Sequence, residues 1–171
     1  MLRRRRRIAF AGAVVLCTIA ACGASVRARQ TPPPGGPVQM SAETITEISL
    51  ERRCFGCERQ FKLTFARDGT ATRTTFGSAR QGIPDRTSAG TVSVAAFDEL
   101  AGRVVAEGFA RLLDEYADPQ TADGASAVTT VTAAGRLKSV VDRHDKAPDA
   151  LRRLQARIEE LATSVVWKPE P

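Results

Sequence analysis

The chain has 171 residues, a formal net charge of +6 and a pI near 9.7, a balance that would suit a nucleic-acid-binding protein. The basic excess, however, is confined to one end of the sequence. Five arginines occupy positions 3–7 and residues 1–21 contain no acidic side chain, so residues 22–171 hold 20 basic and 19 acidic side chains. A net charge of +1 in that part removes the electrostatic argument for a nucleic-acid partner.

Residues 1–21 predict a secretory signal peptide. The arginines are followed by an apolar run, residues 8–21, and by small residues at its end. These are the three parts of an export signal. The run is shorter than the roughly 20 apolar residues that a membrane-spanning helix needs. We therefore expect an exported protein.

The end of this segment reads Ile19-Ala20-Ala21-Cys22. It resembles the lipobox of bacterial lipoproteins, in which the cysteine thiol receives a diacylglycerol and cleavage occurs just before it. Several acyl chains anchor a protein stably, whereas one chain binds weakly. The sequence thus predicts lipidation at Cys22 and a membrane partner reached through that lipid. The expected location is the cell envelope, on the periplasmic side of either membrane or at the cell surface.

Residues 22–40 predict a tether between the lipid and the folded part. The stretch contains Pro32-Pro33-Pro34-Gly35-Gly36 and shows no apolar period. Such a composition builds neither a helix nor an inner strand. Residues 41–168 have the length of one domain and contain no internal repeat. We expect a single domain there.

The first half of that domain predicts strands and one helix. Phe61, Leu63 and Phe65 alternate with polar or small residues over 61–66, the pattern of a strand with one buried face. Asp68-Gly69 supplies a hairpin turn. The remaining expectations are strands over 44–52 and 71–76, a loop over 77–90, a short strand over 91–94 and an amphipathic helix over 95–107.

The second half predicts a hairpin about Gly135, over 127–142, and a terminal helix that begins near Pro148. Apolar residues repeat along one face of that helix, and Trp167 is expected to pack back on the core. The order β-β-β-α-β-β-α favours the α+β class. The predicted architecture is an antiparallel sheet of about five strands with two helices on one face.

The order of motifs resembles a family of uncharacterised bacterial domains found on exported lipoproteins. Members carry an arginine before a Cys-Phe-Gly-x-Cys-Pro motif, then an apolar strand, an Asp-Gly turn and a late Pro-x-x-Leu-x-x-Leu helix ending near a tryptophan. The resemblance covers residues 44–168. The matching residues are Arg52 or Arg53, Cys54, Phe55, Gly56, Cys57, Phe61, Phe65, Asp68, Gly69, Phe97, Leu100, Phe109, Leu112, Tyr116, Thr121, Asp123, Pro148, Leu151, Leu154 and Trp167.

The chain departs from that pattern at the cysteines. Its spacing is C-x-x-C, one residue shorter, and Glu58 stands where the family has proline. A tyrosine common near the last strand is replaced around Arg143 and His144. The resemblance implies a fold and a location, but it implies no activity, catalytic residue or cofactor.

Three interpretations of Cys54 and Cys57 remain open. The first is a structural disulfide, because nearby thiols pair in an oxidising envelope. The second is a thiol–disulfide exchange site, although such sites normally lie at a helix N-terminus and a strand follows this pair. The third is half of a zinc site with His144, the only histidine, which lies in a polar turn. The disulfide is the favoured interpretation.

We therefore expect a non-enzymatic envelope lipoprotein without cofactor or metal. Its domain would bind another envelope component or a protein partner through the exposed face or edge of the sheet. The first alternative is an envelope thiol–disulfide oxidoreductase that uses Cys54 and Cys57. A further alternative is a small-ligand binding domain with its site between the sheet and the helices.

Overall fold

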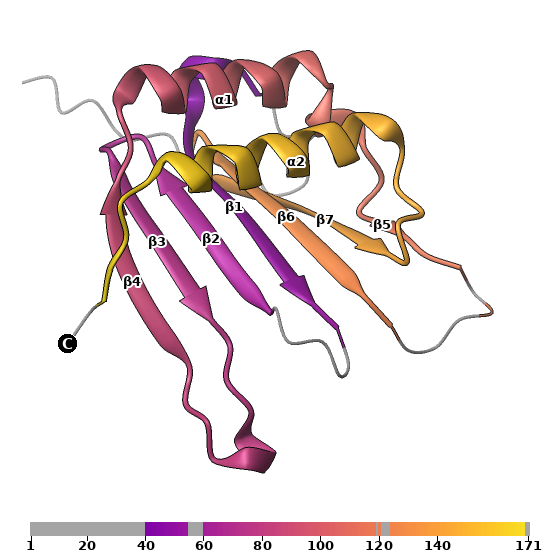
Figure 1. The fold of residues 1–171 in the computed structure, drawn as a ribbon. Coiled ribbons are helices and arrows are strands. Elements are labelled where there is room, and N and C mark those ends of the chain that lie inside the picture. The colour runs from indigo at the N-terminus through magenta and orange to yellow at the C-terminus, as the bar shows by residue number, and fades with distance from the viewer. Residues whose placement is uncertain (1–39, 55–59, 119, 121–123, 170–171) are drawn as a thin grey trace, which may run out of the picture. The chain divides into compact units, whose positions relative to one another are not determined.

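The computed structural model describes residues 40–54, 60–118, 120 and 124–169. They belong to one compact unit, Gly35–Pro171. Figure 1 shows a twisted sheet with both helices over the same face. The elements in chain order are β1 (Ile45–Arg53), β2 (Phe61–Ala66), β3 (Thr70–Thr75), β4 (Arg86–Thr91), α1 (Val94–Ala106), β5 (Glu115–Tyr116), β6 (Ser126–Ala133), β7 (Arg136–Arg143), α2 (Asp149–Ser164) and β8 (Lys168–Pro169).

The sheet has eight strands in the order β5-β7-β6-β1-β2-β3-β4-β8. The first strand therefore lies near the middle, with the meander β1–β4 on one side and the hairpin β6–β7 on the other. All pairs are antiparallel except β5 with β7. Helix α1 carries the chain from β4 back across the sheet, and α2 returns it to the β4 side, where β8 pairs (Figure 1).

The core lies between the sheet and the two helices. Strands β1 and β2 pair with Ile48 opposite Phe65 and Leu50 opposite Leu63, so their apolar side chains share one face. The helices contribute their apolar stripes to the same layer. The buried helical side chains are Phe97, Leu100, Ala101 and Val104 of α1 and Leu151, Leu154, Gln155 and Ile158 of α2.

The α+β class is confirmed, and the predicted strand count and order are wrong. Strand β4 occupies part of the stretch that we expected to be a loop, and β5 and β8 were not foreseen. The sequence of β4 is RTSAGT, which has no buried apolar side chain. Gly90 in this strand lies against the end of α2, since an added Cβ would meet Val165 Cγ1 at 2.4 Å. Strands β5 and β8 have two residues each, too few for a periodic signal.

The short strand expected over 91–94 is not formed, because β4 ends at Thr91 and Ser93 caps α1, its side chain accepting a hydrogen bond from the N–H of Ala96. The remaining expected elements are close to those observed. Strand β2 has the predicted bounds, and α1 begins one residue earlier than expected. The hairpin β6–β7 turns through Ala134 and Gly135, whose φ angles of 50° and 74° are typical of a tight two-residue turn. Trp167 is half-buried and packs against the core, as predicted.

The face of the sheet that the helices leave uncovered is rich in hydroxyl groups. Thr74 Oγ1 lies 3.5 Å from Thr87 Oγ1, and Thr130 Oγ1 lies 2.9 Å from Ser139 Oγ. By the strand register, the threonines of this face include Thr64, Thr72, Thr74, Thr87, Thr130 and Thr132.

None of the helices in the described part of the chain is long and apolar enough to cross a bilayer.

Candidate functional site

Cys54 directly follows the last residue of β1, at the end of the sheet where β2 and β6 begin and β7 ends. Its side chain is half-buried. The guanidinium of the preceding Arg53 lies 4.0 Å from the ring centroid of Phe76. Cys57 and Cys22 fall outside the described residues. The Cys54–Cys57 disulfide and the lipidation of Cys22 therefore remain predictions.

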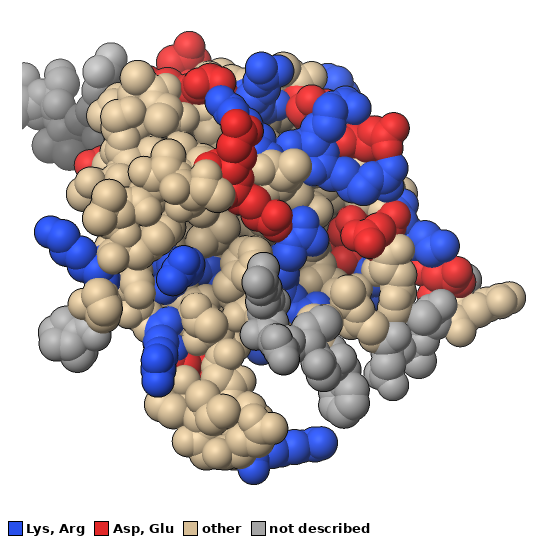
Figure 2. All heavy atoms as spheres, viewed as in Figure 1, with Lys and Arg blue, Asp and Glu red and all other residues tan. Residues whose placement is uncertain are grey.

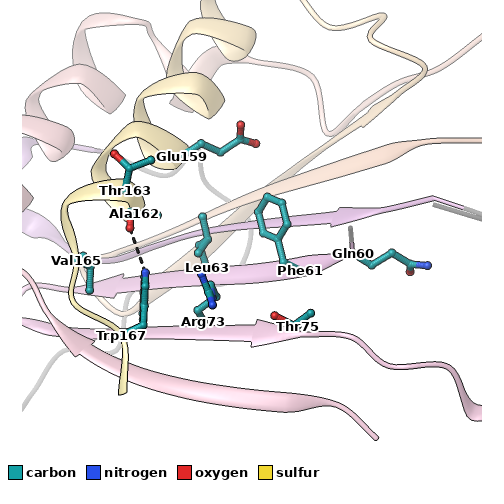
Figure 3. A pocket seen from close by; sticks show the side chains of 10 residues that line it. All are labelled: Gln60, Phe61, Leu63, Arg73, Thr75, Glu159, Ala162, Thr163, Val165 and Trp167. Atoms are coloured by element: carbon teal, nitrogen blue, oxygen red, sulfur yellow. Dashed lines mark hydrogen bonds between the residues drawn. The ribbon is translucent and has the colours of Figure 1, made fainter. Parts of the chain in front are cut away.

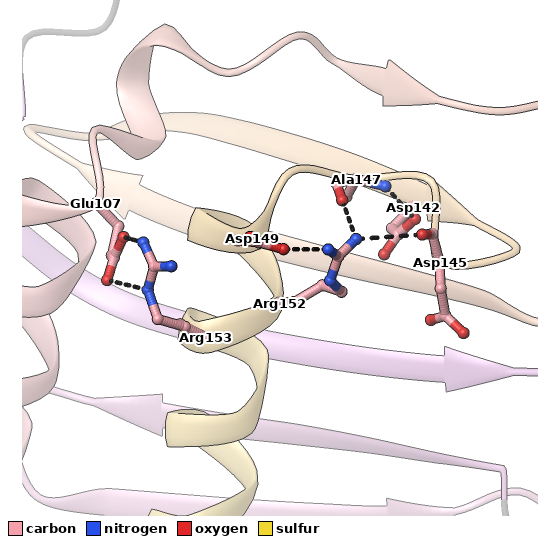
Figure 4. A network of polar contacts seen from close by, with 7 residues as sticks. All are labelled: Glu107, Asp142, Asp145, Ala147, Asp149, Arg152 and Arg153. Carbon is pink, nitrogen blue, oxygen red and sulfur yellow. Dashed lines mark hydrogen bonds and ion pairs between the residues drawn. The ribbon is translucent and has the colours of Figure 1, made fainter.

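A small cavity of about 90 Å³ lies beside Cys54, lined also by Arg52, Arg53 and Asp142. Asp142 is 1 % exposed. Its Oδ1 accepts a hydrogen bond from the backbone N–H of Ala147 at 2.9 Å (Figure 4). Its Oδ2 is buried and receives no hydrogen bond from any described residue. A buried oxygen without a donor is an unusual feature in a folded protein.

His144 lies near the same end of the sheet, in the turn after β7. His144 and Asp145 both have positive φ, 57° and 54°. The imidazole packs against Gly124, because an added Cβ there would meet His144 Cε1 at 2.2 Å. Within the described ranges, no three His, Cys, Asp or Glu side chains are grouped as a metal site would require. Because Cys57 lies outside those ranges, the predicted trio itself stays untested.

A hollow lies between the C-terminal half of α2 and strands β2 and β3, and we call it the groove. Its volume is about 580 Å³, within the roughly 300–1,000 Å³ of small-molecule sites. Figure 3 shows side chains from the helix and from the sheet converging on it. The lining residues are Gln60, Phe61, Leu63, Arg73, Thr75, Glu159, Ala162, Thr163, Val165 and Trp167.

The chain after α2 closes one end of the groove. The N–H of Val165 donates to the carbonyl of Ala162 at 3.4 Å as the helix ends. The indole Nε1 of Trp167 donates to the same carbonyl at 3.1 Å (Figure 3). The tryptophan ring is thereby fixed against the helix end. The absence of a side chain at Gly90 leaves the space that Val165 and Trp167 occupy.

The groove has a charged side chain on each wall, Glu159 on the helix side and Arg73 on the sheet side, and only one of them has a partner of opposite charge among the described residues. Glu159 of α2 forms an ion pair with Arg52 of β1, so its charge is already compensated. The guanidinium of Arg73 lies 5.5 Å from the ring centroid of Trp167, within the range of a cation–π contact. Arg73 has no acidic partner among the described residues.

The sequence predicted a ligand site between the sheet and the helices only as an alternative function, and no groove residue was identified as part of such a site. The sequence of β3 nevertheless contains an indication of the groove. Ala71, Arg73 and Thr75 face the helices because they pair with Phe65, Leu63 and Phe61 of β2. Only Ala71 of the three is buried. Polar residues on the core side of a strand mark where the core ends and the groove begins.

The profile of a family described as a domain of unknown function matches residues 46–162. The chain belongs to the DUF6438 family. This agrees with the expected family of uncharacterised domains, and the match runs from β1 to α2. A comparison with curated proteins gives no match.

Proposed function

We propose that the chain is a lipid-anchored lipoprotein of the cell envelope whose DUF6438 domain is a non-enzymatic binding module. The anchor rests on the arginine-rich start, the short apolar run and Cys22 after small residues. Residues 22–40 then act as a Pro- and Gly-rich tether. This arrangement would hold the domain near a membrane surface and leave it free to meet a ligand.

The groove between α2 and β2–β3 carries the binding part of the proposal. It combines a concave apolar surface with a few polar groups, as ligand sites do. Trp167 and Phe61 supply aromatic contact area, and Gln60 and Thr75 supply hydrogen-bonding groups. The carboxylate that lines it, Glu159, is engaged by Arg52. These side chains suit recognition of a ligand better than a chemical step on it.

We also propose that Cys54 and Cys57 form a structural disulfide that fixes the connection between β1 and β2. In support, Cys54 follows a strand, and no helix of the described residues begins at it. A reactive thiolate is normally stabilised at a helix N-terminus. A reduction potential below about −300 mV would agree with a structural role, whereas one between about −230 and −120 mV would favour the oxidoreductase alternative.

The anchor is tested by metabolic labelling with an alkyne-bearing palmitate in bacteria that express the full chain. We expect the wild type to carry the label and to sediment with membranes. Cys22→Ser should lose the label and appear in the soluble fraction, whereas Cys17→Ser, inside the apolar run, should behave as the wild type. A Cys22→Ser protein that keeps the label would contradict the proposal.

The binding part is tested with N-phenyl-1-naphthylamine, a neutral apolar dye, and the full chain carrying Cys22→Ser. Trp167 is the only tryptophan, so energy transfer from indole to dye reports on the groove. We expect saturable transfer that Phe61→Lys, at a half-buried position in the groove, abolishes and that Leu137→Lys, on the uncovered sheet face, leaves unchanged. Absence of saturable transfer would contradict the groove as a binding site.

A further inference from the structure

We propose that the groove takes a single-chain amphiphile with a carboxylate head, and that Arg73 and Arg86 recognise the head. This inference rests on the proposed binding function and specifies its ligand. It follows from two properties of the groove: uncompensated positive charge at its rim and an apolar floor beside that charge.

The positive charge comes from neighbouring positions on β3 and β4. Arg73 pairs with Ser88 and Thr75 pairs with Arg86, so both arginines face the helix side of the sheet as diagonal neighbours. Diagonal positions across a strand pair lie about 7–8 Å apart, within reach of long side chains. Both arginines are exposed. A shared anion would relieve the repulsion between the two like charges.

Neither arginine has an acidic partner among the described residues. The carboxylate on the opposite wall, Glu159, is paired with Arg52. Asp85, next to Arg86, accepts a hydrogen bond from the backbone N–H of Gly77 at 2.8 Å. Figure 2 shows acidic and basic side chains mixed over the helices, whereas basic ones predominate toward the β3–β4 end. An anion is therefore the complementary ligand for this rim.

The floor of the groove is apolar next to the same charge. Leu63 is the register partner of Arg73 and is 3 % exposed. Phe61, Val165 and the Trp167 ring continue this surface (Figure 3). An anion without an apolar body would leave that surface in water. A ligand with both parts buries the apolar walls and places its carboxylate against guanidinium groups, which bind carboxylates in a forked geometry.

The test compares decanoate, 1-decanol and decyltrimethylammonium below their critical micelle concentrations. The protein is the full chain carrying Cys22→Ser. Calorimetry gives the affinity, and Trp167 emission reports the site. Charge-assisted hydrogen bonds contribute about 1.5–3 kcal/mol, so decanoate should bind at least about tenfold more tightly than decanol. Arg73→Gln and Arg86→Gln should each reduce that preference and keep the affinity for decanol. Arg103→Gln, an equal change of net charge on α1, should leave it intact.

Four results would contradict the inference, each at a different step. Equal affinities for decanoate and decanol overturn the inference and leave a neutral binding groove. A preference that survives Arg73→Gln combined with Arg86→Gln overturns the role of these arginines. Binding to vesicles of anionic phospholipid without binding to free decanoate overturns the proposed ligand. Failure of all three amphiphiles together with failure of the neutral dye overturns the groove itself, and with it the binding part of the proposed function.

Discussion

Arg52 of β1 and Glu159 of α2 form an ion pair between the sheet and the last helix, 107 positions apart in the chain. The pair lies at the junction of two features of the site. Glu159 lines the groove, and Arg52 lines the small cavity beside Cys54. The side chains of Arg52 and Glu159 are 33 % and 39 % exposed, so the pair itself contributes little to folding stability.

We expect Arg52→Gln to affect ligand binding in the groove more than folding stability. It should lower the free energy of unfolding by less than about 1 kcal/mol, as for other solvent-exposed pairs. It also leaves the carboxylate of Glu159 uncompensated in the groove wall, so decanoate should bind more weakly while decanol binds as before. Adding Glu159→Gln should restore the decanoate affinity. Weak binding in the double variant would show that Arg52 acts in another way.

Gly135 and Gly102 allow a comparison of the same substitution, Gly→Ala, in two different backbone conformations. Gly135 has a φ of +74° and Gly102 lies inside α1, and an added Cβ meets no atom within 4 Å at either position. Gly135→Ala should destabilise the protein by about 1–2 kcal/mol, because a side chain is strained at positive φ. Gly102→Ala should stabilise it by about 0.5–1 kcal/mol through helix propensity. Urea unfolding measures both, and shifts of the same sign would contradict this explanation.

Strong periodic segments of this fold could be predicted from sequence, and weak ones could not. The alternation of Phe61, Leu63 and Phe65 predicts β2 with its observed bounds. The same reasoning fails for β4, because its partners on the core side are Ala71, Arg73 and Thr75 of β3. A strand that covers no apolar core needs no apolar side chains, and its sequence then looks like that of a loop.

The groove could not be predicted from the sequence, for a related reason. It depends on how closely the end of α2 approaches the sheet. Gly90 of β4 and Trp167, in the segment between α2 and β8, set that approach. The buried position of Asp142 is equally a tertiary property. Its sequence neighbours, Val141 and Arg143, give no sign that this carboxylate points inward at the end of β7.

Asp142 allows a prediction about a buried hydrogen bond. Asp142→Ala removes the acceptor of the Ala147 N–H and leaves that group unsatisfied, at a cost of about 1–3 kcal/mol. Asp142→Asn keeps a carbonyl oxygen for this N–H and removes a carboxylate whose other oxygen has no donor among the described residues. Burying a neutral amide costs less than burying a charge. We expect the Asn variant to unfold at higher urea than the Ala variant. Equal midpoints would mean that the hydrogen bond contributes nothing.

The ion pair of Glu107 and Arg153, which links the end of α1 to α2, predicts a pH dependence. Arg153 Nη2 and Nε lie 2.7 Å and 3.0 Å from the two carboxylate oxygens. The hydrogen bond from Arg153 holds the pKa of Glu107 below its ordinary value of 4.5. The folded state therefore binds this proton less readily than the unfolded chain does. The stabilisation is present above the ordinary pKa and is lost as the pH falls through the lowered one.

Arg153→Gln should therefore reduce the free energy of unfolding at about pH 6, where carboxylates are ionised, and the difference from the wild type should shrink in acid. Urea unfolding at several pH values measures this difference. Arg80→Gln makes the same change of charge in the Ala79–Gln81 turn and should show no such trend. A difference for Arg153→Gln that stays constant as Glu107 becomes protonated would mean that Arg153 stabilises the helix pair by packing its aliphatic stem.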